Sequence, residues 1–367
     1  MEGRTRPTSE LRALVEAVTA GIDDPIDKAK ALYQHVNELV ATTQGENRAV
    51  AVALEKSGDR TVLFKALLDL AGVDSSWAFL RPREATLPKV DWSLPSAGQF
   101  PFRFVAIERA GLSPTFVTLD TRHLPFGRLG GSLRGGKAFL LGLTSSRIVP
   151  LPGLVPEEES MSFDVVIGQT TGSSADVRFR IVMRLARGYQ QKERFRTVPA
   201  FQKQSLLQGL ASQFYPGCKV KRGEFTNLND ENAPLTIEIE LTAPQLVARS
   251  SLIKPLPQPL SLLRSLGGSV DRRHPLHLNR DRIQLDRVEI ELSDEYGTDL
   301  LPKSTVLASP LGTFSLSYEQ KGKSIVVTRD LVLLAGRLPA SEYRDLVDFC
   351  ERVDAAEAEN VVLRPLK

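Results

Sequence analysis

The sequence has 367 residues, of which 42% are hydrophobic, 25% charged and 7% aromatic. This composition is typical of a folded globular protein and excludes a disordered, collagen-like or disulfide-rich chain. The 47 basic and 44 acidic residues leave a formal net charge of only +3, so we expect no nucleic-acid partner. No apolar run approaches the roughly 18 residues that a membrane span needs, so no transmembrane segment is predicted.

Residues that could hold a metal are scarce. The two cysteines, Cys218 and Cys350, lie far apart and form no Cys-x-x-Cys motif. His274 and His277 have the spacing His-x-x-His, but no carboxylate or cysteine pattern accompanies them, and a surface connector is the better interpretation. We therefore expect neither a metal nor another cofactor.

Three helices are predicted in the first 75 residues. The first covers about residues 9–18. The second begins with Asp24 as its N-cap and Pro25 in the first helical position, the preferred places for these residue types. The third runs over about residues 60–71 and ends at Gly72, which is typical of a helix C-terminus.

Short strands follow these helices. Apolar runs predict strands at 77–80, 102–107, 115–119 and 139–141, the middle two joined by a turn around Gly111. Helices followed by an antiparallel sheet indicate an α+β domain.

The rest of the chain is predicted to be rich in strands. A connector at 150–159, with three prolines and three glutamates, marks the first boundary. We expect three domains: 1–154, an α+β module at 155–256, and a β-sandwich-like module at 257–367. In these two modules, strands are predicted at 163–168, 177–184, 218–225, 235–241, 287–292, 313–319, 325–333 and 361–363, and helices at 200–214 and 339–358.

One segment, residues 54–73, carries candidate chemistry. Ser57 lies at the start of the third helix, and Asp59 follows two residues later. A helix N-terminus has free N–H groups and a partial positive charge, which stabilise an anion. A cysteine in place of Ser57 would therefore be an activated thiolate, whereas Asp59 has the simpler role of helix N-cap.

Residues 54–73 resemble the transglutaminase-like superfamily, in which a Cys-x-Asp element opens the equivalent helix of a papain-like fold. The helix at 27–36 is similar to the one that precedes the cysteine in that family. Residues 100–107 lie where the family has its histidine strand, and Leu119-Asp120-Thr121-Arg122 resembles its aspartate segment. The resemblance covers residues 1–150.

The resemblance implies a degenerate catalytic triad. The family's cysteine falls on Ser57, its histidine on Phe104 (or Phe102 if the register shifts), and its aspartate on Asp120. A thiolate–imidazole pair is therefore missing, and phenylalanine cannot act as a base. We expect a non-catalytic domain that binds a peptide, glycan or protein partner, and not an enzyme.

Two alternatives remain open. A serine acyl hydrolase could use Ser57 as nucleophile, His123 as base and Asp120 to orient the histidine. The chain could also be an assembly module of a larger cell-envelope protein. Its C-terminal half is similar to bacterial proteins of unknown function in which β-sandwich domains flank a transglutaminase-like domain. That resemblance implies an exported or periplasmic protein, although the chain shows no signal peptide.

Overall fold

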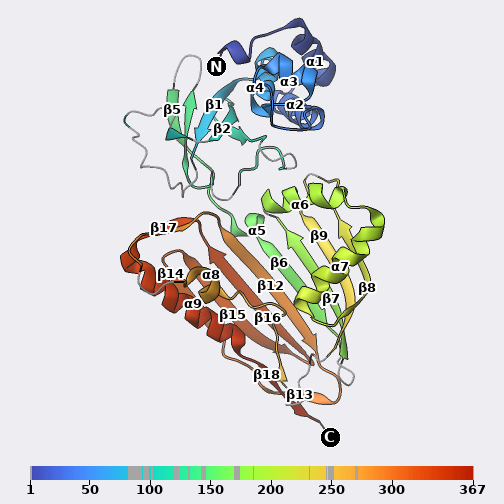
Figure 1. The fold of residues 1–367 in the computed structure, drawn as a ribbon. Coiled ribbons are helices and arrows are strands. Elements are labelled where there is room, and N and C mark those ends of the chain that lie inside the picture. Colours follow the sequence, from blue (N-terminus) through green and yellow to red (C-terminus); the bar gives the residue numbers. More distant parts are fainter. Residues whose placement is uncertain are drawn as a thin grey trace. The chain divides into compact units, whose positions relative to one another are not determined.

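The computed structural model describes residues 2–81, 93, 99–100, 102–119, 124–130, 133–141, 146–168, 174–184, 186–230, 232–244, 246, 252–268 and 272–366. The chain divides into two compact units, Met1–Leu154 and Val155–Lys367, which we call the N-terminal and the C-terminal unit (Figure 1). Among the described helices, none is both long enough and apolar enough to cross a membrane.

The N-terminal unit begins with helices. After a short 3-10 turn at Glu2–Arg4, they are α1 (Ser9–Thr19), α2 (Pro25–Leu39), α3 (Ala49–Glu55) and α4 (Arg60–Leu70). The Asp24 carboxylate accepts the backbone N–H groups of Ile26 (2.8 Å) and Asp27 (3.0 Å), so Asp24 is the expected N-cap. The three predicted helices are confirmed, whereas α3 is a helix that the sequence pattern did not indicate.

An antiparallel sheet completes this unit. Its strand order is β3-β2-β1-β4-β5. The strands are β1 (Ser75–Leu80), β2 (Phe102–Ile107), β3 (Thr115–Val117), β4 (Lys137–Leu141) and β5 (Ser146–Pro150). Both faces of the sheet are apolar: Trp77 and Val105 pack with the helices, and Ala78 and Phe104 pack in a second cluster on the opposite face. The unit is α+β, as predicted.

The C-terminal unit is built on an eight-stranded sheet with the order β14-β15-β16-β12-β6-β7-β9-β8. Its strands are β6 (Met161–Ile167), β7 (Ser174–Met183), β8 (Lys219–Thr226), β9 (Leu235–Pro244), β12 (Arg282–Glu291), β14 (Thr305–Ser309), β15 (Gly312–Lys321) and β16 (Ser324–Leu333). Neighbouring strands are antiparallel except β6 and β12, which are parallel. This parallel pair joins two four-stranded halves into one sheet.

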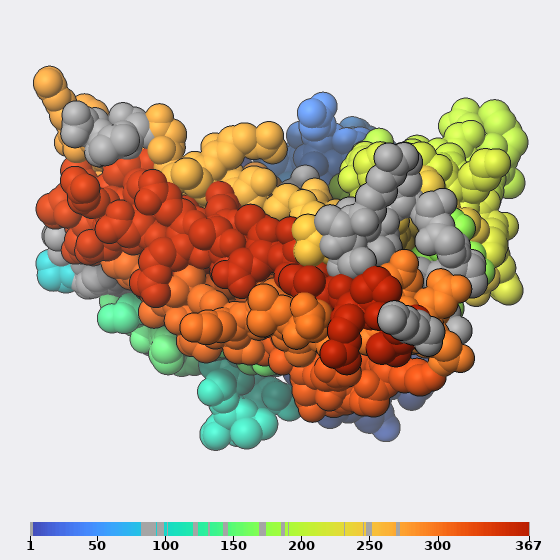
Figure 2. Space-filling view, turned by 90° about the horizontal axis from the view of Figure 1, so that it is seen from below, coloured from blue at the N-terminus to red at the C-terminus, as the bar shows by residue number. Residues whose placement is uncertain are grey.

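The C-terminal unit also contains helices and small sheets. The helices are α5 (Pro156–Glu159), α6 (Ala186–Arg196), α7 (Ala200–Phe214), α8 (Leu262–Leu266) and α9 (Tyr343–Ala358), the last preceded by a 3-10 turn at Ala340–Glu342. The small sheet has the order β10-β18-β13, from β10 (Leu252–Ile253), β13 (Tyr296–Leu300) and β18 (Val361–Pro365). A two-stranded sheet pairs β11 (Leu276–Leu278) with β17 (Gly336–Leu338). Helices α7, α8 and α9 and the small sheet that contains β18 contribute side chains to the core under one face of the large sheet. Strand β18 pairs with β13, and Figure 2 shows red C-terminal residues next to orange residues on this face.

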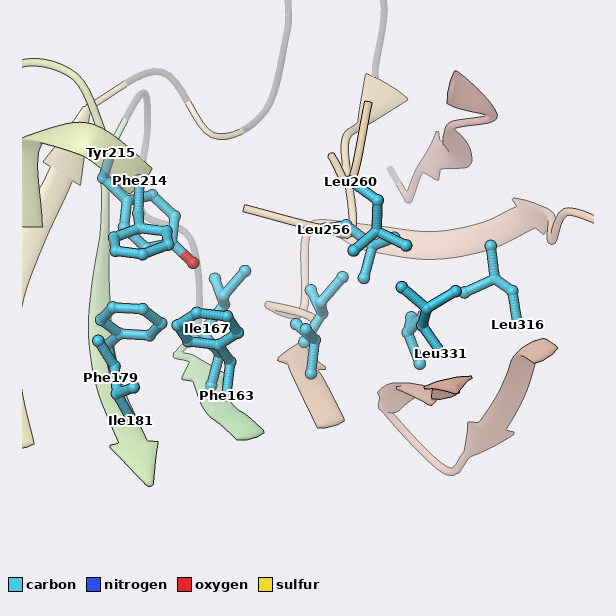
Figure 3. Close-up of a cluster of buried hydrophobic side chains, with 14 of the residues drawn as sticks. Phe163, Ile167, Phe179, Ile181, Phe214, Tyr215, Leu256, Leu260, Leu316 and Leu331 are labelled. Carbon is cyan, nitrogen blue, oxygen red and sulfur yellow. The ribbon is translucent and has the colours of Figure 1, made fainter. Parts of the chain in front are cut away.

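A single hydrophobic core runs through this unit. Figure 3 shows aromatic rings at one side, with Phe179 and Phe214 only 4.6 Å apart between centroids, and aliphatic side chains such as Leu260 and Leu331 at the other. The predicted boundary at residue 256 therefore does not separate two cores, because strands from 155–256 and 257–367 share one sheet and one core. The expected sandwich has a small second sheet, and α7 and α9 supply the rest of that layer.

Candidate functional site

The N-terminus of α4 has a well-defined geometry, fixed by a capping carboxylate and a glycine turn. The Asp59 carboxylate accepts the backbone N–H of Val62 at 3.1 Å and so caps the helix. Gly58 precedes it with φ of +119°, and a Cβ there would lie 2.1 Å from the Glu46 carbonyl oxygen. Only glycine fits this position, because both the backbone conformation and the close approach exclude a side chain.

Ser57 lies directly before this turn and is half-buried. Its hydroxyl donates to the carbonyl oxygen of Gln44 at 2.7 Å. The backbone around Thr42 also runs alongside Ser57 as an isolated parallel bridge, and the Gly58 N–H donates to the Thr42 carbonyl at 2.9 Å. The segment before α3 therefore packs against Ser57, and the Ser57 hydroxyl donates its hydrogen bond to a neutral backbone carbonyl.

Phe104 does not lie on the α4 side of the sheet. It is only 2% exposed and packs in the cluster on the face away from the helices. Phe102 lies on the same face, with its ring 6.4 Å from that of Phe104. The structure does not bring Phe104 or Phe102 together with Ser57, because alternate residues of a strand point to opposite faces.

Arg103 is the residue of β2 that reaches α4. Its guanidinium forms an ion pair with the Asp59 carboxylate and lies 5.0 Å from the ring centroid of Trp77. The two charged side chains are 22% and 28% exposed. The Arg103 Nε is buried and has no hydrogen-bond partner among the described residues. A guanidinium remains protonated and has no acceptor, so Arg103 cannot serve as a general base.

A second arginine fixes the surroundings of this site. Arg60, the first residue of α4, is 5% exposed. It donates from Nε to the Val40 carbonyl at 3.0 Å and from Nη1 to the Leu119 carbonyl at 3.4 Å. These bonds connect the start of α4 with the end of α2 and with the segment after β3. Asp120 and His123, the other predicted site residues, lie outside the described residues.

Neither arginine was predicted from the sequence as a site residue. The available signal was weak: Arg103 is the one charged residue in the apolar strand Phe102–Ile107, and such a residue is buried only when it is paired. Arg60 follows the helix N-cap, where a positive charge opposes the helix dipole, so its presence there needs another explanation. The hydrogen bonds from Arg60 to the Val40 and Leu119 carbonyls explain why an arginine is found there.

The C-terminal unit contains a more deeply buried charge cluster. Arg329 on β16 contacts the carboxylates of Asp286 on β12 and Glu357 on α9, and the three side chains are 1–2% exposed. Arg329 also donates to the Gln258 carbonyl at 2.9 Å, and Glu357 accepts the Leu260 N–H at 2.7 Å. The cluster thereby ties the proline-rich segment at 255–260 to the sheet and to α9.

Burial shifts the pKa values of the two carboxyl groups in this cluster. Desolvation raises the pKa of Asp286 and that of Glu357, and the opposing attraction of Arg329 only partly offsets it. Asp286 also accepts the backbone N–H of Phe163 on β6 at 3.1 Å, so it connects the two halves of the sheet. All three side chains bond protein groups, which indicates a structural role.

The open face of the half-sheet β6-β7-β9-β8 has a depression of about 360 Å³. Its lining includes Arg178, Arg180, Arg222, Asp164, Glu224 and Glu238. Charges of both signs alternate across it, and Arg180 pairs with Glu238 at 3.3 Å, both about half exposed. Such cross-strand pairs stabilise a solvated sheet face, and the mixed sign gives no preference for a phosphate backbone.

Among the described residues, no group of three or more His, Cys, Asp or Glu side chains is placed so that it could hold a metal ion. His277 lies on β11, with a buried Nδ1 that has no described partner, and His274 precedes that strand and is exposed. Cys218 and Cys350 are buried free thiols.

Comparison with known proteins gives two likenesses. Residues 254–363 match a family described as a domain of unknown function with a solved structure, DUF3858. No curated protein sequence matches the chain. Over 99% of its length the chain is similar to the crystal structure of a "putative protease" from Parabacteroides distasonis, with a TM-score of 0.54 and 12% sequence identity. The chain spans 57% of the length of that protein. At this identity the likeness concerns the fold alone, and it agrees with the α+β arrangement of the chain.

Proposed function

We propose that residues 1–154 form a transglutaminase-like domain without catalytic activity, and that the chain acts as a binding or scaffold module for a peptide, glycan or protein partner. One observation carries this proposal. The Ser57 hydroxyl is bonded to the Gln44 carbonyl, while the strand residue that faces the start of α4 is Arg103.

The chemistry of the site supports the absence of catalysis. Acyl transfer at this position needs a nucleophile next to a group that can accept its proton. Arg103 cannot accept a proton, and the carboxylate of Asp59 is engaged by both Arg103 and the helix N-cap. A reactive pair is thus replaced by an ion pair that stabilises the helix N-terminus.

The geometry also favours a different alignment of the triad. If the resemblance to the transglutaminase-like superfamily holds, the histidine position corresponds to Arg103 and not to Phe104, because Arg103 is on the face that α4 covers. In that alignment Arg103 takes the position of the imidazole, and its guanidinium lies against the Trp77 ring.

A fluorophosphonate probe tests the proposal against the hydrolase alternative. We expect no labelling of the wild-type chain, because among the described residues no side chain that could accept the Ser57 proton bonds its hydroxyl. The matched control for a change of the fold is Ser76→Ala, which removes from β1 a buried serine hydroxyl that is bonded to Glu108. Labelling that is lost in Ser57→Ala but retained in Ser76→Ala would overturn the proposal and establish an active serine.

A further inference from the structure

The edges of the two larger described sheets differ in how they avoid pairing with another chain. The edge strands are β3, β5, β8 and β14. Strand β3 has only three residues, and β5 contains Arg147 and Pro150. Strand β8 carries two lysines, an arginine and a glutamate, and its register shifts between Val220 and Arg222. Short length, charge, proline and bulges are the usual protections of a sheet edge.

Strand β14 is as short as β5, but it has no charge, no proline and no bulge. Its sequence, Thr305-Val-Leu-Ala-Ser309, contains no charge and no proline, and its register with β15 is regular. Val306 is 81% exposed, more than any other large hydrophobic side chain in the described structure, and Ala308 on the same face is also exposed. An exposed, regular and uncharged edge strand is a template for adding another strand.

The backbone groups available on this edge follow from the hairpin. Ser309 pairs with Gly312 across a two-residue turn, so these residues exchange hydrogen bonds with each other. Alternation then directs the N–H and C=O groups of Val306 and Ala308 away from β15. An added strand would meet four unpaired backbone groups at the centre of β14.

The sequence of β14 is complementary to a second copy of itself in an antiparallel pair. Read in reverse, Thr-Val-Leu-Ala-Ser keeps its pattern of hydroxyl, apolar, leucine, apolar and hydroxyl. We propose that two copies of the chain pair through β14, antiparallel and centred on Leu307. Thr305 then lies opposite Ser309 of the second copy, and Val306 opposite Ala308 of the second copy.

This pairing is chemically self-complementary. Apolar residues meet apolar residues, hydroxyls meet hydroxyls, and no like charges face each other, all of which favour cross-strand pairs. Both copies use the same edge, so the two-fold symmetry closes the assembly and prevents fibre growth. Pro302 and Pro310 limit the pairing to this segment. The inference concerns the C-terminal unit and does not depend on the role of Ser57.

Sedimentation velocity of the full chain tests whether the dimer exists. One strand pair buries far less area than a standard interface, so we expect a reversible dimer that dissociates in the roughly 10–100 µM range. Val306→Lys introduces an edge charge at an exposed position and should make the chain monomeric. Ser317→Lys, an exposed site on β15, adds the same charge away from the edge and should leave the dimer unchanged.

A monomer at all concentrations would overturn the proposal and leave the edge to a strand of another protein. A dimer that persists in Val306→Lys, or one that Ser317→Lys disrupts equally, would also contradict it. The wild-type and variant chains should have the same circular dichroism spectrum, because neither side chain is buried.

Cysteine cross-linking tests the register independently. Val306→Cys and Ala308→Cys proteins are oxidised alone and as an equal mixture. The proposed pairing places Cα atoms of positions 306 and 308 from different copies about 5.5 Å apart, within disulfide range. We expect a cross-linked dimer to form much faster in the mixture than in either protein alone. Equal rates in all three samples would show that the edges do not pair in this register.

Discussion

Each unit of the molecule contains an arginine bound to a carboxylate, and the two sites differ in what surrounds them. The Arg103–Asp59 pair of the N-terminal unit is 22% and 28% exposed, and it lies at a helix N-terminus beside Trp77. The Arg329 cluster of the C-terminal unit is 1–2% exposed, and its two carboxylates bond backbone groups of two further segments.

The difference separates a buried cluster that joins several segments from a pair with few contacts, which we propose stands in place of a reactive centre. Arg329 makes contacts to β12, to α9 and to the segment at 255–260, so its removal would leave several buried groups without partners. Arg103 makes one ion pair and one ring contact, and its Nε is without a described partner. A residue with so few contacts can be exchanged while the fold is retained.

The largest effect is expected from Arg329→Met. This change leaves Asp286 and Glu357 buried without their counter-charge, which costs about 3–5 kcal/mol in the free energy of unfolding. Urea unfolding followed by circular dichroism measures this loss. Tryptophan fluorescence would not report on the C-terminal unit, because both tryptophans of the chain, Trp77 and Trp92, belong to the N-terminal unit.

Arg180→Met provides the control for Arg329→Met. It breaks the half-exposed pair with Glu238 and should cost about 0–1 kcal/mol. Equal losses of stability in the two variants would show that the buried cluster is no more important than a surface ion pair.

A smaller effect is expected from Asp59→Ala. This variant loses both the N-cap to Val62 and the ion pair with Arg103, which costs about 1–2 kcal/mol. Tryptophan fluorescence during urea unfolding reports it, since Arg103 contacts Trp77. Asp59→Asn keeps a capping oxygen and removes the charge, so it should lose less. If Asn and Ala destabilise the unit equally, the cap contributes nothing and the ion pair accounts for the whole effect.

The smallest effect concerns pH. Desolvation raises the pKa of Asp286 in the folded protein, so the folded state binds a proton more readily than the unfolded state does. Its contribution to the unfolding free energy is therefore greatest below the unfolded pKa and decreases as the pH rises through the folded pKa. In Asp286→Asn the slope of unfolding free energy against pH above about 4 should become more positive.

Asp176 gives the matched comparison, because hydrogen bonds from Lys221 and Thr242 lower its pKa. Its stabilisation is present above the unfolded pKa and is lost as the pH falls through the folded pKa. Asp176→Asn should therefore make the slope less positive at acidic pH. Slopes that change in the same direction in both variants would contradict the assigned causes of the two shifts.

The sequence predicted the regular elements with strong patterns. Capping residues and apolar spacing located α1, α2 and α4, and the predicted strands at 313–319 and 325–333 fall within β15 and β16. Helix α3 was missed because Ala49–Glu55 alternates alanine and valine, a pattern with the period of a strand. Strand β14 has five residues and no flanking periodic signal, so composition alone could not locate it.

The site could be predicted only in part. The position of Ser57 at the start of a helix, with Asp59 as its N-cap, followed from the sequence. The residue facing it did not, because β2 is buried and apolar on both faces from Phe104 to Ile107, and such a strand gives no pattern that fixes which face points to α4. The pairing of Arg103 with Asp59 depends on which face of β2 packs against the helices, and this is set by the tertiary structure.

We propose that Arg103 occupies the place of a catalytic histidine. The most direct test introduces a thiol at position 57 and measures the pH dependence of its alkylation by iodoacetamide. Three variants are compared: Ser57→Cys, Ser57→Cys/Arg103→His and Ser57→Cys/Phe104→His. Peptide mapping separates the introduced thiol from Cys218 and Cys350, which are buried. An imidazolium next to a thiolate lowers the thiol pKa and extends its reactivity to acidic pH.

We expect this extension in the Arg103→His double variant alone, since position 104 faces the opposite side of the sheet. Reactivity at acidic pH in the Phe104→His double variant, with none in the Arg103→His double variant, would contradict the account.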